Sequence, residues 1–340
     1  MNRKLARKEE KGRNLAKQVR ELLEERGMET YRKVQQAILE EKIECSEIRE
    51  ALKHFLSYKQ MGFLVRPTLI SLGCEAVGGD AGLVSDVAVP LVLLSGGMDI
   101  HDDIIDDSRT QDSSLTVFGR FKRDVSLLTG DALLFQGLVM WHKLAEKLEL
   151  KRFIKMTNML KEAFFEVGDS EALELGLLGR IDVEPERYLQ IIRKKAADIG
   201  LLFRIGATLG NGPQAEIEAL SEYGRFLGML WVLGDDLSDI FDPKEMARRA
   251  NNGCLPLPVL YGLRNPEFAS QLRKILLKKS ITQTNAKAIF QLTKNADGLK
   301  QTRDLMKDNA SQALEEAKGF RNIEKLKLLV QASLEPFIKK

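Results

Sequence analysis

The chain has 340 residues, 44% of them hydrophobic, and its 52 Lys and Arg against 49 Asp and Glu give a formal net charge of +3. The apolar fraction is large enough for a sizeable core, and so small a charge surplus does not indicate a nucleic-acid partner. Three cysteines, Cys45, Cys74 and Cys254, form no CxxC pair, so we expect a reducing, cytoplasmic location rather than a disulfide framework.

The N-terminal segment is basic and has no apolar stretch of the kind found in signal peptides. We expect residues 1–30 to form a basic helix that is loosely attached to the rest of the chain. The longest apolar run, residues 87–98, is interrupted by Pro90, Gly96 and Gly97. On that basis we expect no transmembrane segment.

Apolar residues recur at spacings of three and four through most of the chain, as in residues 19–41, 153–167 and 323–340, and no segment keeps a period of two. This pattern predicts an all-α fold. Clusters of Gly, Pro, Asn and Ser predict breaks at residues 62–67, 78–81, 107–114, 176–185, 210–213, 242–258 and 265–266. We therefore expect ten or more helices, packed as a single domain over residues 1–340.

Two acidic motifs of the form DDxxD stand far apart in the sequence, in HDDIIDD at residues 101–107 and in GDDLSDIFD at residues 234–242. On a helix, Asp102 and Asp106 share one face, and so do Asp235 and Asp239. Carboxylates at that spacing repel one another, and a hard cation such as Mg²⁺ relieves the repulsion.

A solvated acidic surface is the simpler explanation of either motif alone. The segments before the motifs, LVLLSGGMDI and GRFLGMLWVL, are however too apolar for an exposed helix. We therefore expect two acidic helices that face each other across a central apolar cavity. Magnesium ions beside such a cavity suit the removal of diphosphate from an apolar substrate.

A competing interpretation starts from the adjacent His101 and Asp102, which resemble the metal ligands of HD-type phosphohydrolases. That chemistry needs further histidines, and the chain offers only His54 and His142 besides. His142 lies in a pattern typical of an ordinary packed helix, so we reject this alternative.

The sequence resembles the trans-isoprenyl diphosphate synthases, the polyprenyl synthetase family with the class I isoprenoid synthase fold. The resemblance runs from about residue 58 to residue 258, and its strongest parts are the two motifs with TVFGRFKRDVSLLTGDALLF after the first and CLPLPVLYGL after the second. It implies a helical bundle, usually dimeric, that binds up to three magnesium ions. The implied ligands are Asp102 and Asp106 for two ions and Asp235 for the third, with Asp239 nearby and Asp103 supporting the first cluster.

The resemblance also implies a reaction. An allylic prenyl diphosphate ionises, the double bond of isopentenyl diphosphate attacks the cation, and loss of a proton gives a chain five carbons longer. Arg66 in VRP matches a diphosphate-binding arginine of the family. Lys194 matches the lysine that holds the allylic diphosphate, although the threonine that follows it in the family is Lys195 here.

Several positions depart from the family pattern, chiefly those that bind isopentenyl diphosphate. The replacements are Phe63 for a lysine, Ser95 for a histidine, Gln111 and Asp112 for an arginine pair, Val232 for a glutamine and Cys254 for a lysine. An arginine gives a bidentate, charge-assisted grip on phosphate, whereas an aspartate repels it. Arg109, Arg248 and Arg249 lie close enough in sequence to be candidate substitutes.

Three functions are compatible with two complete DDxxD motifs and an isopentenyl diphosphate site that has lost most of its basic residues. The chain could be one subunit of a heteromeric polyprenyl diphosphate synthase, a class I terpene synthase or prenyl diphosphate lyase, or a non-catalytic regulatory subunit. We favour the first. The second needs metals and a cavity but no acceptor site, and the third is disfavoured because both motifs are complete.

Two further segments bear on the substrate. Gly97 and Met98 lie one helical turn before the first motif, and we consider two explanations for the glycine: open space for a chain of about twenty carbons or more, or close helix packing. Residues 242–258 are polar, basic and rich in turn residues, and we expect a flexible lid there with Lys244, Arg248 and Arg249 as candidate phosphate contacts.

Overall fold

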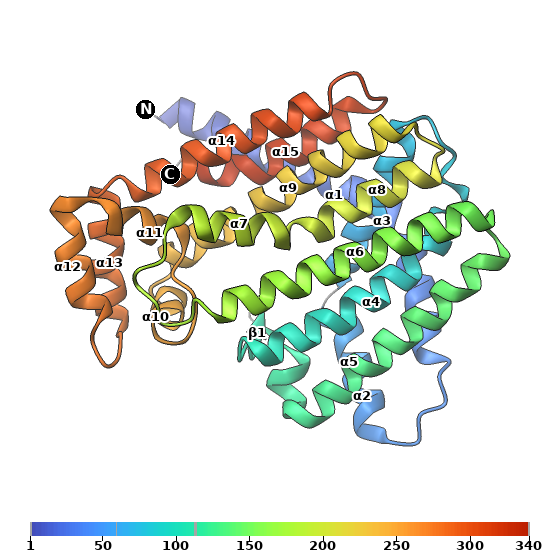
Figure 1. Ribbon diagram of the computed structural model, residues 1–340, viewed down its shortest axis with the longest axis horizontal. Coiled ribbons are helices and arrows are strands. Elements are labelled where there is room, and N and C mark those ends of the chain that lie inside the picture. The colour runs from blue at the N-terminus through green and yellow to red at the C-terminus, as the bar shows by residue number, and fades with distance from the viewer. Residues whose placement is uncertain (1, 59, 112–113, 339–340) are drawn as a thin grey trace. The chain divides into compact units, whose positions relative to one another are not determined.

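The computed structural model describes residues 2–58, 60–111 and 114–338, and the side chains of residues 2–11 and 60 fall outside that description. The described residues form fifteen α-helices, two short 3₁₀ helices and one two-stranded hairpin (Figure 1). The predicted all-α fold of ten or more helices is therefore confirmed. The elements are α1 Asn2–Leu39, α2 Ser46–Tyr58, α3 Gln60–Ala76, η1 Ala81–Leu83, α4 Val84–Ile105, β1 Thr110–Gln111, β2 Ser114–Leu115, α5 Val117–Lys143, η2 Leu144–Glu146, α6 Leu150–Leu175, α7 Pro185–Lys195, α8 Ala197–Leu209, α9 Gln214–Phe241, α10 Pro243–Asn252, α11 Leu257–Arg264, α12 Pro266–Leu276, α13 Gln283–Asn295, α14 Gly298–Glu316 and α15 Ile323–Ile338.

The chain divides into two compact units. Unit 1 comprises Met1–Ala16, Met159–Leu201 and Ala215–Lys340, and unit 2 comprises Lys17–Asn158 and Leu202–Gln214. The first acidic motif belongs to unit 2 and the second to unit 1. The expectation of one domain over the whole chain, with the two motifs face to face, stays a prediction.

Helix α4 is the centre of unit 2. It packs along its length against α5 and also contacts α3 (Figure 1). Side chains from α1 to α5 meet in one apolar cluster that includes Phe55, Leu93 and Leu133. The segment Ala81–Ile105 is long and apolar enough to cross a membrane, but 67% of its apolar window is buried inside the protein, as in the core helix of a globular fold.

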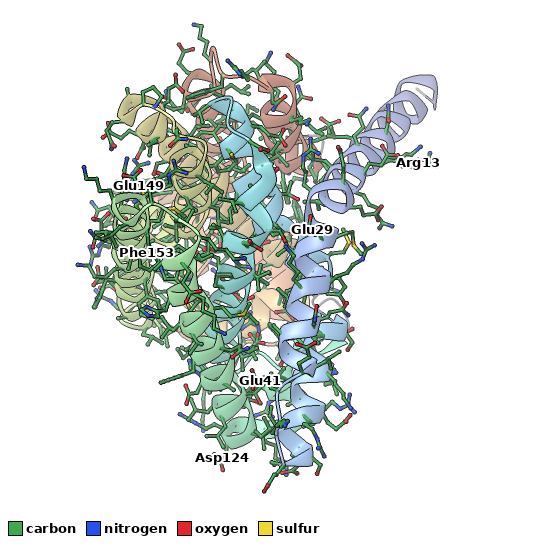
Figure 2. All side chains as sticks on the ribbon, turned by 90° about the vertical axis from the view of Figure 1, so that its right-hand side faces the viewer. Arg13, Glu29, Glu41, Asp124, Glu149 and Phe153 are labelled. Carbon is green, nitrogen blue, oxygen red and sulfur yellow. The ribbon has the colours of Figure 1, made fainter. Side chains whose placement is uncertain are left out.

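The C-terminal half of helix α1 is packed against the rest of unit 2. Leu22, Leu23 and Thr30 are buried, and Val34 is fully enclosed. The helix expected to be loosely attached over residues 1–30 is therefore held by unit 2 from Leu22 onward. Figure 2 shows this helix with Arg13 and Glu29 on it.

The predicted break at residues 62–67 is wrong, because these residues lie inside α3 with Pro67 in the helix interior. Pro90 likewise lies inside α4. A proline removes one helical hydrogen bond, but burial of the surrounding apolar side chains keeps each helix continuous. The expected lid over residues 242–258 is also mostly a helix, α10, whose N-terminus is capped where the Asp242 side chain accepts from the Lys244 backbone N–H.

In unit 1, two side-chain hydrogen bonds tie helix α9 to α15. The hydroxyl of Tyr223 on α9 donates to the backbone oxygen of Leu326 on α15 at 2.8 Å, and the indole of Trp231 donates to Ser333 at 2.7 Å. These bonds satisfy polar groups that the packing would otherwise bury at a cost. Helix α9 is thereby fixed along the stretch that leads to the second acidic motif.

Candidate functional site

The first acidic motif occupies the last turn of α4. Asp106 is the residue that ends the helix, and its N–H donates to the carbonyl oxygen of Asp102 at 2.9 Å. The following Asp107 takes a left-handed conformation with φ 49°. The C-terminal end of a helix carries a partial negative charge, so carboxylates there are destabilised by the helix dipole as well as by one another. A cation bound at the motif would therefore relieve both the repulsion among the carboxylates and their repulsion by the helix dipole.

The three motif aspartates differ in exposure. Asp106 is exposed, whereas Asp102 and Asp103 are half-buried, and the Oδ1 of Asp102 and the Oδ2 of Asp103 are shielded from water. Tyr58 on α2 lies close by: burial raises its pKa, and the charges of Asp103 and Asp99 raise it further. The Tyr58 hydroxyl therefore stays neutral near Asp103 and Asp99, and the supporting role of Asp103 stays a prediction.

Arg66 reaches the same helix from α3. Its Nη2 lies 3.6 Å from the Oδ1 of Asp99, one turn before the motif, and its side chain is 20% exposed. The half-buried guanidinium keeps a charge beside the acidic end of α4. The predicted diphosphate-binding arginine and the first motif therefore belong to one local arrangement in unit 2.

The loop after the first motif is shaped by residues that sequence reasoning did not single out. The Thr116 hydroxyl donates to the Ser108 carbonyl at 2.8 Å and accepts from the Gly119 N–H at 3.0 Å, so it ties the loop to the first turn of α5. A Cβ at Gly119 would overlap the Arg109 carbonyl oxygen. The segment TVFG, which contains Thr116 and Gly119, was the sequence signal for this loop, and it was noted above only for its family resemblance.

Arg109, a candidate phosphate contact, is held on this loop. Its Nη2 donates to Asp107 at 2.9 Å, and its guanidinium lies 4.7 Å from the centre of the Phe118 ring. More than half of the side chain is exposed. Arg109 is therefore available near the first motif, and its role with substrate stays a prediction.

The second motif lies in the last two turns of α9, and its aspartates point to different surroundings. Asp235 is exposed, Asp239 is half-buried and Asp236 is buried. Asp236 accepts three hydrogen bonds, from the Tyr188 hydroxyl at 3.0 Å, from Arg249 at 2.9 Å and from the Leu257 N–H at 2.9 Å. Asp236 is thus a structural carboxylate that joins α7, α9, α10 and α11.

The buried charges at the second motif influence one another. Burial raises the pKa of Asp236 and of Asp239, and the nearby Arg249 guanidinium opposes both shifts. Burial works against the charge of Arg249, but Tyr188, Asp236 and Asp239 raise its pKa well above the ordinary value. Arg249 therefore stays charged and pairs with both carboxylates.

Lys194, the predicted ligand of the allylic diphosphate, lies in the last turn of α7, where the helix dipole favours a cation. Its Nζ donates to Asp169 of α6 at 2.6 Å. The adjacent Lys195 pairs with Glu171 at 3.1 Å and also with Glu174. Both lysines are held by carboxylates of α6, and the assignment of Lys194 to diphosphate stays a prediction.

Two of the positions that depart from the family pattern, Phe63 and Cys254, are buried, and Ser95 and Val232 are half-buried. Phe63 is 4% exposed and packs edge to face on Phe55, with ring centres 5.2 Å apart. Cys254 is buried, and burial raises the pKa of its thiol to about 12, so it carries no charge. Gln111 is exposed on β1, and Asp112 lies outside the described residues. Phe63 and Cys254 therefore add no cation to a phosphate site.

The glycines before the first motif are explained by packing. A Cβ at Gly97 would lie 2.6 Å from the Gly130 carbonyl oxygen and 2.7 Å from Leu134 Cγ, and one at Gly96 would lie 2.7 Å from the Phe55 ring. Of the two explanations for Gly97, these distances favour close helix packing, because α5 fills the space beside its Cα; a contact of Gly97 with substrate stays a prediction. Met98 is half-buried, and its contact with substrate stays a prediction.

We expect Gly97→Ala to lower the free energy of unfolding by about 1–3 kcal/mol, because the new methyl group meets backbone that cannot move aside. Gly168→Ala on α6 is the matched control: nothing lies within 4 Å of its Cβ position, so the gain in helix propensity should stabilise the protein by about 0.5–1 kcal/mol. Urea unfolding of both variants measures the difference. Stabilisation by Gly97→Ala would show that the site is open.

The acidic residues of the first motif suit a magnesium ion that is held by few protein ligands. Among the described residues, no three His, Cys, Asp or Glu side chains are gathered as a preformed metal cage. Mg²⁺ commonly binds through one or two carboxylates and completes its shell with water and substrate phosphate oxygens. The pair Asp102 and Asp106 at the end of α4 fits that donor set.

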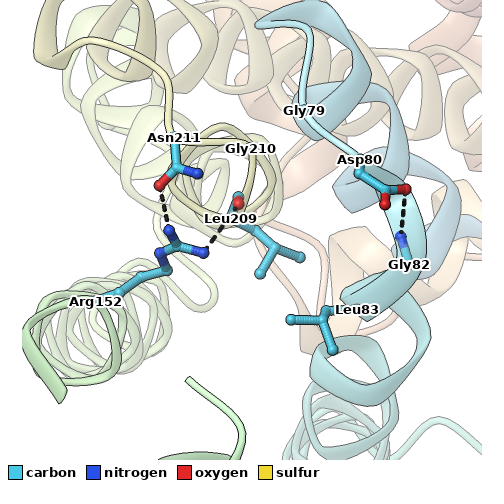
Figure 3. A pocket seen from close by; sticks show the side chains of 8 residues that line it. All are labelled: Gly79, Asp80, Gly82, Leu83, Arg152, Leu209, Gly210 and Asn211. Atoms are coloured by element: carbon cyan, nitrogen blue, oxygen red, sulfur yellow. Dashed lines mark hydrogen bonds between the residues drawn. The ribbon is translucent and has the colours of Figure 1, made fainter. Parts of the chain in front are cut away.

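A surface cavity of about 220 Å³ lies elsewhere in unit 2, at the end of α8 and the start of η1. Figure 3 shows Arg152 donating across it to the Leu209 carbonyl, at 3.4 Å, and to the Asn211 side chain. None of the predicted site residues lines this cavity. It therefore plays no part in the candidate site.

Comparisons with known proteins agree with the geometry. A family model described as polyprenyl synthetase matches residues 46–293. A short chain isoprenyl diphosphate synthase of Methanothermobacter thermautotrophicus is 33% identical over 192 residues, which are 54% of this chain and 56% of that protein. Heptaprenyl diphosphate synthase component 2 of Bacillus subtilis is 26% identical over 244 residues, 70% of this chain and 68% of the relative.

Among solved structures, a geranylgeranyl pyrophosphate synthetase from Pyrococcus horikoshii has a similar fold, with a TM-score of 0.81 and 22% identity over 93% of this chain and 99% of that one. At that identity the likeness shows the fold. The match to the archaeal short chain synthase spans little more than half of that relative's length.

Proposed function

Because this chain belongs to the polyprenyl synthetase family and has its class I isoprenoid synthase fold, we propose that it is a prenyltransferase. It ionises an allylic prenyl diphosphate in a magnesium-dependent step and elongates the product with isopentenyl diphosphate. The observation that carries this proposal is the acidic end of α4, where Asp102 and Asp106 lie at the negative pole of the helix, with Asp99 one turn before them and Arg66 of α3 beside Asp99.

Each group has a separate task in this reaction. Magnesium, when bound, would neutralise the charge that develops on the departing diphosphate. Asp102, Asp106 and Asp235 hold the ions, and Asp103 supports the first cluster from its half-buried position. Arg66 and Lys194 bind the diphosphate oxygens, with Arg109 and Arg248 as further cations. The apolar core beside α4 keeps water from the allylic cation.

We place the chain in an assembly with a related synthase subunit, as the name "component 2" says of the Bacillus subtilis relative. Phe63 and Cys254 occupy positions where the family has cations, and both side chains are buried, Phe63 within the apolar cluster of unit 2. A partner with an intact isopentenyl diphosphate site would supply what these positions lack. A reducing, cytoplasmic location agrees with the three free cysteines.

The surface available for a partner in unit 2 lies on α5 and the start of α6. The two helices are adjacent, because the Trp141 indole donates to Thr157 at 3.0 Å, and Figure 2 labels Asp124 on α5 and Phe153 on α6. Exposed apolar side chains gather there and form what we call the α5–α6 apolar surface: Leu127, Leu128, Phe135, Leu138, Val139, Leu150 and Ile154. Such a row of large apolar side chains is typical of a subunit interface.

We expect Phe135→Asp to weaken subunit association by about 30-fold or more, since burying a carboxylate in an apolar interface costs about 2 kcal/mol or more. Sedimentation velocity across a concentration series measures this for the chain alone and with its co-purified partner. Leu277→Asp is the control, because Leu277 is as exposed as Phe135 but lies after α12. Unchanged association of Phe135→Asp would place the interface elsewhere.

A class I terpene synthase or prenyl diphosphate lyase is the second candidate, favoured by the same buried Phe63, because ionisation of one substrate needs no acceptor diphosphate. The assay that separates the candidates uses the purified chain with Mg²⁺ and a C15 or C20 allylic diphosphate, with and without isopentenyl diphosphate. Elongated prenyl products support the prenyltransferase. Diphosphate release without isopentenyl diphosphate supports the lyase, and activity that appears only with a co-purified subunit supports the heteromer. No turnover in any arm would leave the regulatory subunit.

A further inference from the structure

Arg249 makes a set of contacts unusual for a residue in a basic, turn-rich segment. Its side chain is 14% exposed, and each of its three nitrogens is engaged. Nη1 donates to Asp239 at 2.9 Å, Nη2 donates to Asp236 at 2.9 Å and to Tyr188 at 3.2 Å, and Nε donates to the Cys254 carbonyl at 2.7 Å. All four contacts lie within unit 1.

These contacts change what the second motif can offer to a metal ion. Asp236 is 1% exposed and its oxygens accept from the chain itself, and the Oδ2 of Asp239 faces Arg249. Asp235 is the exposed aspartate of the motif. A cation that bound Asp239 through that oxygen would have to displace a guanidinium that is also anchored to Tyr188 and Cys254.

We propose that Arg249 takes the place of a metal ion at the second motif: it neutralises Asp236 and Asp239 permanently and leaves Asp235 as the metal-binding carboxylate of that motif. This proposal rests on the proposed function for the identity of the ions. It also replaces the expectation that Asp239 lies in the metal shell. Arg249 is then a positioning residue, which acts through α9 and not on the substrate.

The physical basis is the geometry of the guanidinium. Its planar fork donates to two carboxylates at once and keeps its charge at any ordinary pH, whereas Mg²⁺ must first shed tightly held water to bind them. Breaking a buried pair leaves uncompensated charge and is strongly destabilising. Arg249 also links the end of α9 to the segment after α10, so the same contacts fix the direction in which Asp235 points.

The first test is thermal unfolding of Arg249→Met with and without 10 mM Mg²⁺. We expect a fall in melting temperature of about 10 °C without the ion, and substantial recovery with Mg²⁺, because Asp236 and Asp239 are no longer neutralised by the guanidinium and then accept the ion. The wild-type protein should respond less to Mg²⁺. Arg264→Met is the matched control, since Arg264 also pairs with two carboxylates, Glu184 and Glu186, but at an exposed site; it should lose little stability and gain nothing from Mg²⁺.

The second test does not depend on whether Arg249→Met folds. Binding of Mn²⁺ in the presence of inorganic diphosphate, followed by the EPR signal of free Mn²⁺, is compared between wild type, Asp239→Asn, Asp235→Asn and Asp102→Asn. We expect Asp239→Asn to bind Mn²⁺ within about twofold of wild type, and the other two variants to lose affinity by about tenfold or more.

Loss of Mn²⁺ affinity in Asp239→Asn as large as in Asp102→Asn overturns the proposal. Equal stabilisation of wild type and Arg249→Met by Mg²⁺ also overturns it. Neither measurement requires prenyl turnover. A chain that binds ions as expected but forms no prenyl product refutes the prenyltransferase and leaves the role of Arg249 standing.

Discussion

Asp102→Asn is expected to lower magnesium-dependent turnover of the allylic diphosphate by about a hundredfold or more. The substitution keeps the size of the side chain and removes one carboxylate from the end of α4, so the charge that develops on the departing diphosphate loses part of its stabilisation. Loss of one preorganised electrostatic contact to a transition state typically costs about 10²–10³ in kcat. Initial rates of diphosphate release at saturating Mg²⁺, in the assembly that supports turnover, measure the effect.

The same variant should keep its stability, because loss of one charge relieves repulsion at the negative end of the helix. Asp107→Asn is the matched control: it removes a neighbouring exposed charge, and asparagine tolerates the left-handed conformation with φ 49° that this position requires. An equal loss of rate in both variants would mean that the rate depends on the net negative charge of this region, and not on Asp102 as a metal ligand. A rate above about a tenth of wild type in Asp102→Asn would remove Asp102 from the metal site.

The sequence predicted the fold class and the local form of both motifs because these depend on short spacings. A period of three and four over most of the chain indicated helices, and Asp102 with Asp106 fall on one helical face whatever surrounds them. The family resemblance added Arg66, which comes from a different helix. Its position 3.6 Å from Asp99 is a contact between distant segments that no periodicity predicts.

The parts that sequence reasoning missed all depend on contacts across long separations in the chain. Arg249 resembled an exposed lid residue, since α10 is polar and basic, and only the approach of Tyr188 and Asp236 makes it a buried charge. Gly97 allowed both open space and close packing until the position of Gly130 on α5 decided between them. In each case the local composition was interpreted correctly, but the distant residue that contacts the position could not be predicted.

At Pro67 a local sequence rule gave the wrong result, because packing outweighs the tendency of proline to break a helix. A proline eight positions into a helix favours a break, yet α3 continues to Ala76 because Leu69, Ile70 and Leu72 are fully enclosed. Burial of three such side chains is worth several kcal/mol, of the order of the roughly 3 kcal/mol that proline costs inside a helix. Composition can locate a weak point, but the packing decides whether the chain breaks there.

Phe63→Lys, which introduces the residue that the family has at this position, is expected to destabilise the protein by about 3–5 kcal/mol, and not to improve use of isopentenyl diphosphate. Phe63 is enclosed between Phe55, at 5.2 Å, and Tyr31, with ring centres 5.7 Å apart. Removing a buried aromatic ring costs about 3–5 kcal/mol, and an ammonium in its place finds no counter-charge in an apolar cluster.

Met61→Lys controls for the added charge, because Met61 is exposed two positions earlier on the same helix, and its effect should stay within about 0.5 kcal/mol. Urea unfolding gives the stability of both variants, and the KM for isopentenyl diphosphate is measured on the fraction that remains folded. A stable Phe63→Lys protein with a lower KM would mean that the side chain turns toward a phosphate site. A single substitution would then restore the isopentenyl diphosphate site of the family in this chain. No partner subunit would be needed to supply that site. The packing of Phe63 against Phe55 and Tyr31 argues for the other result, in which the lysine position has become part of the core.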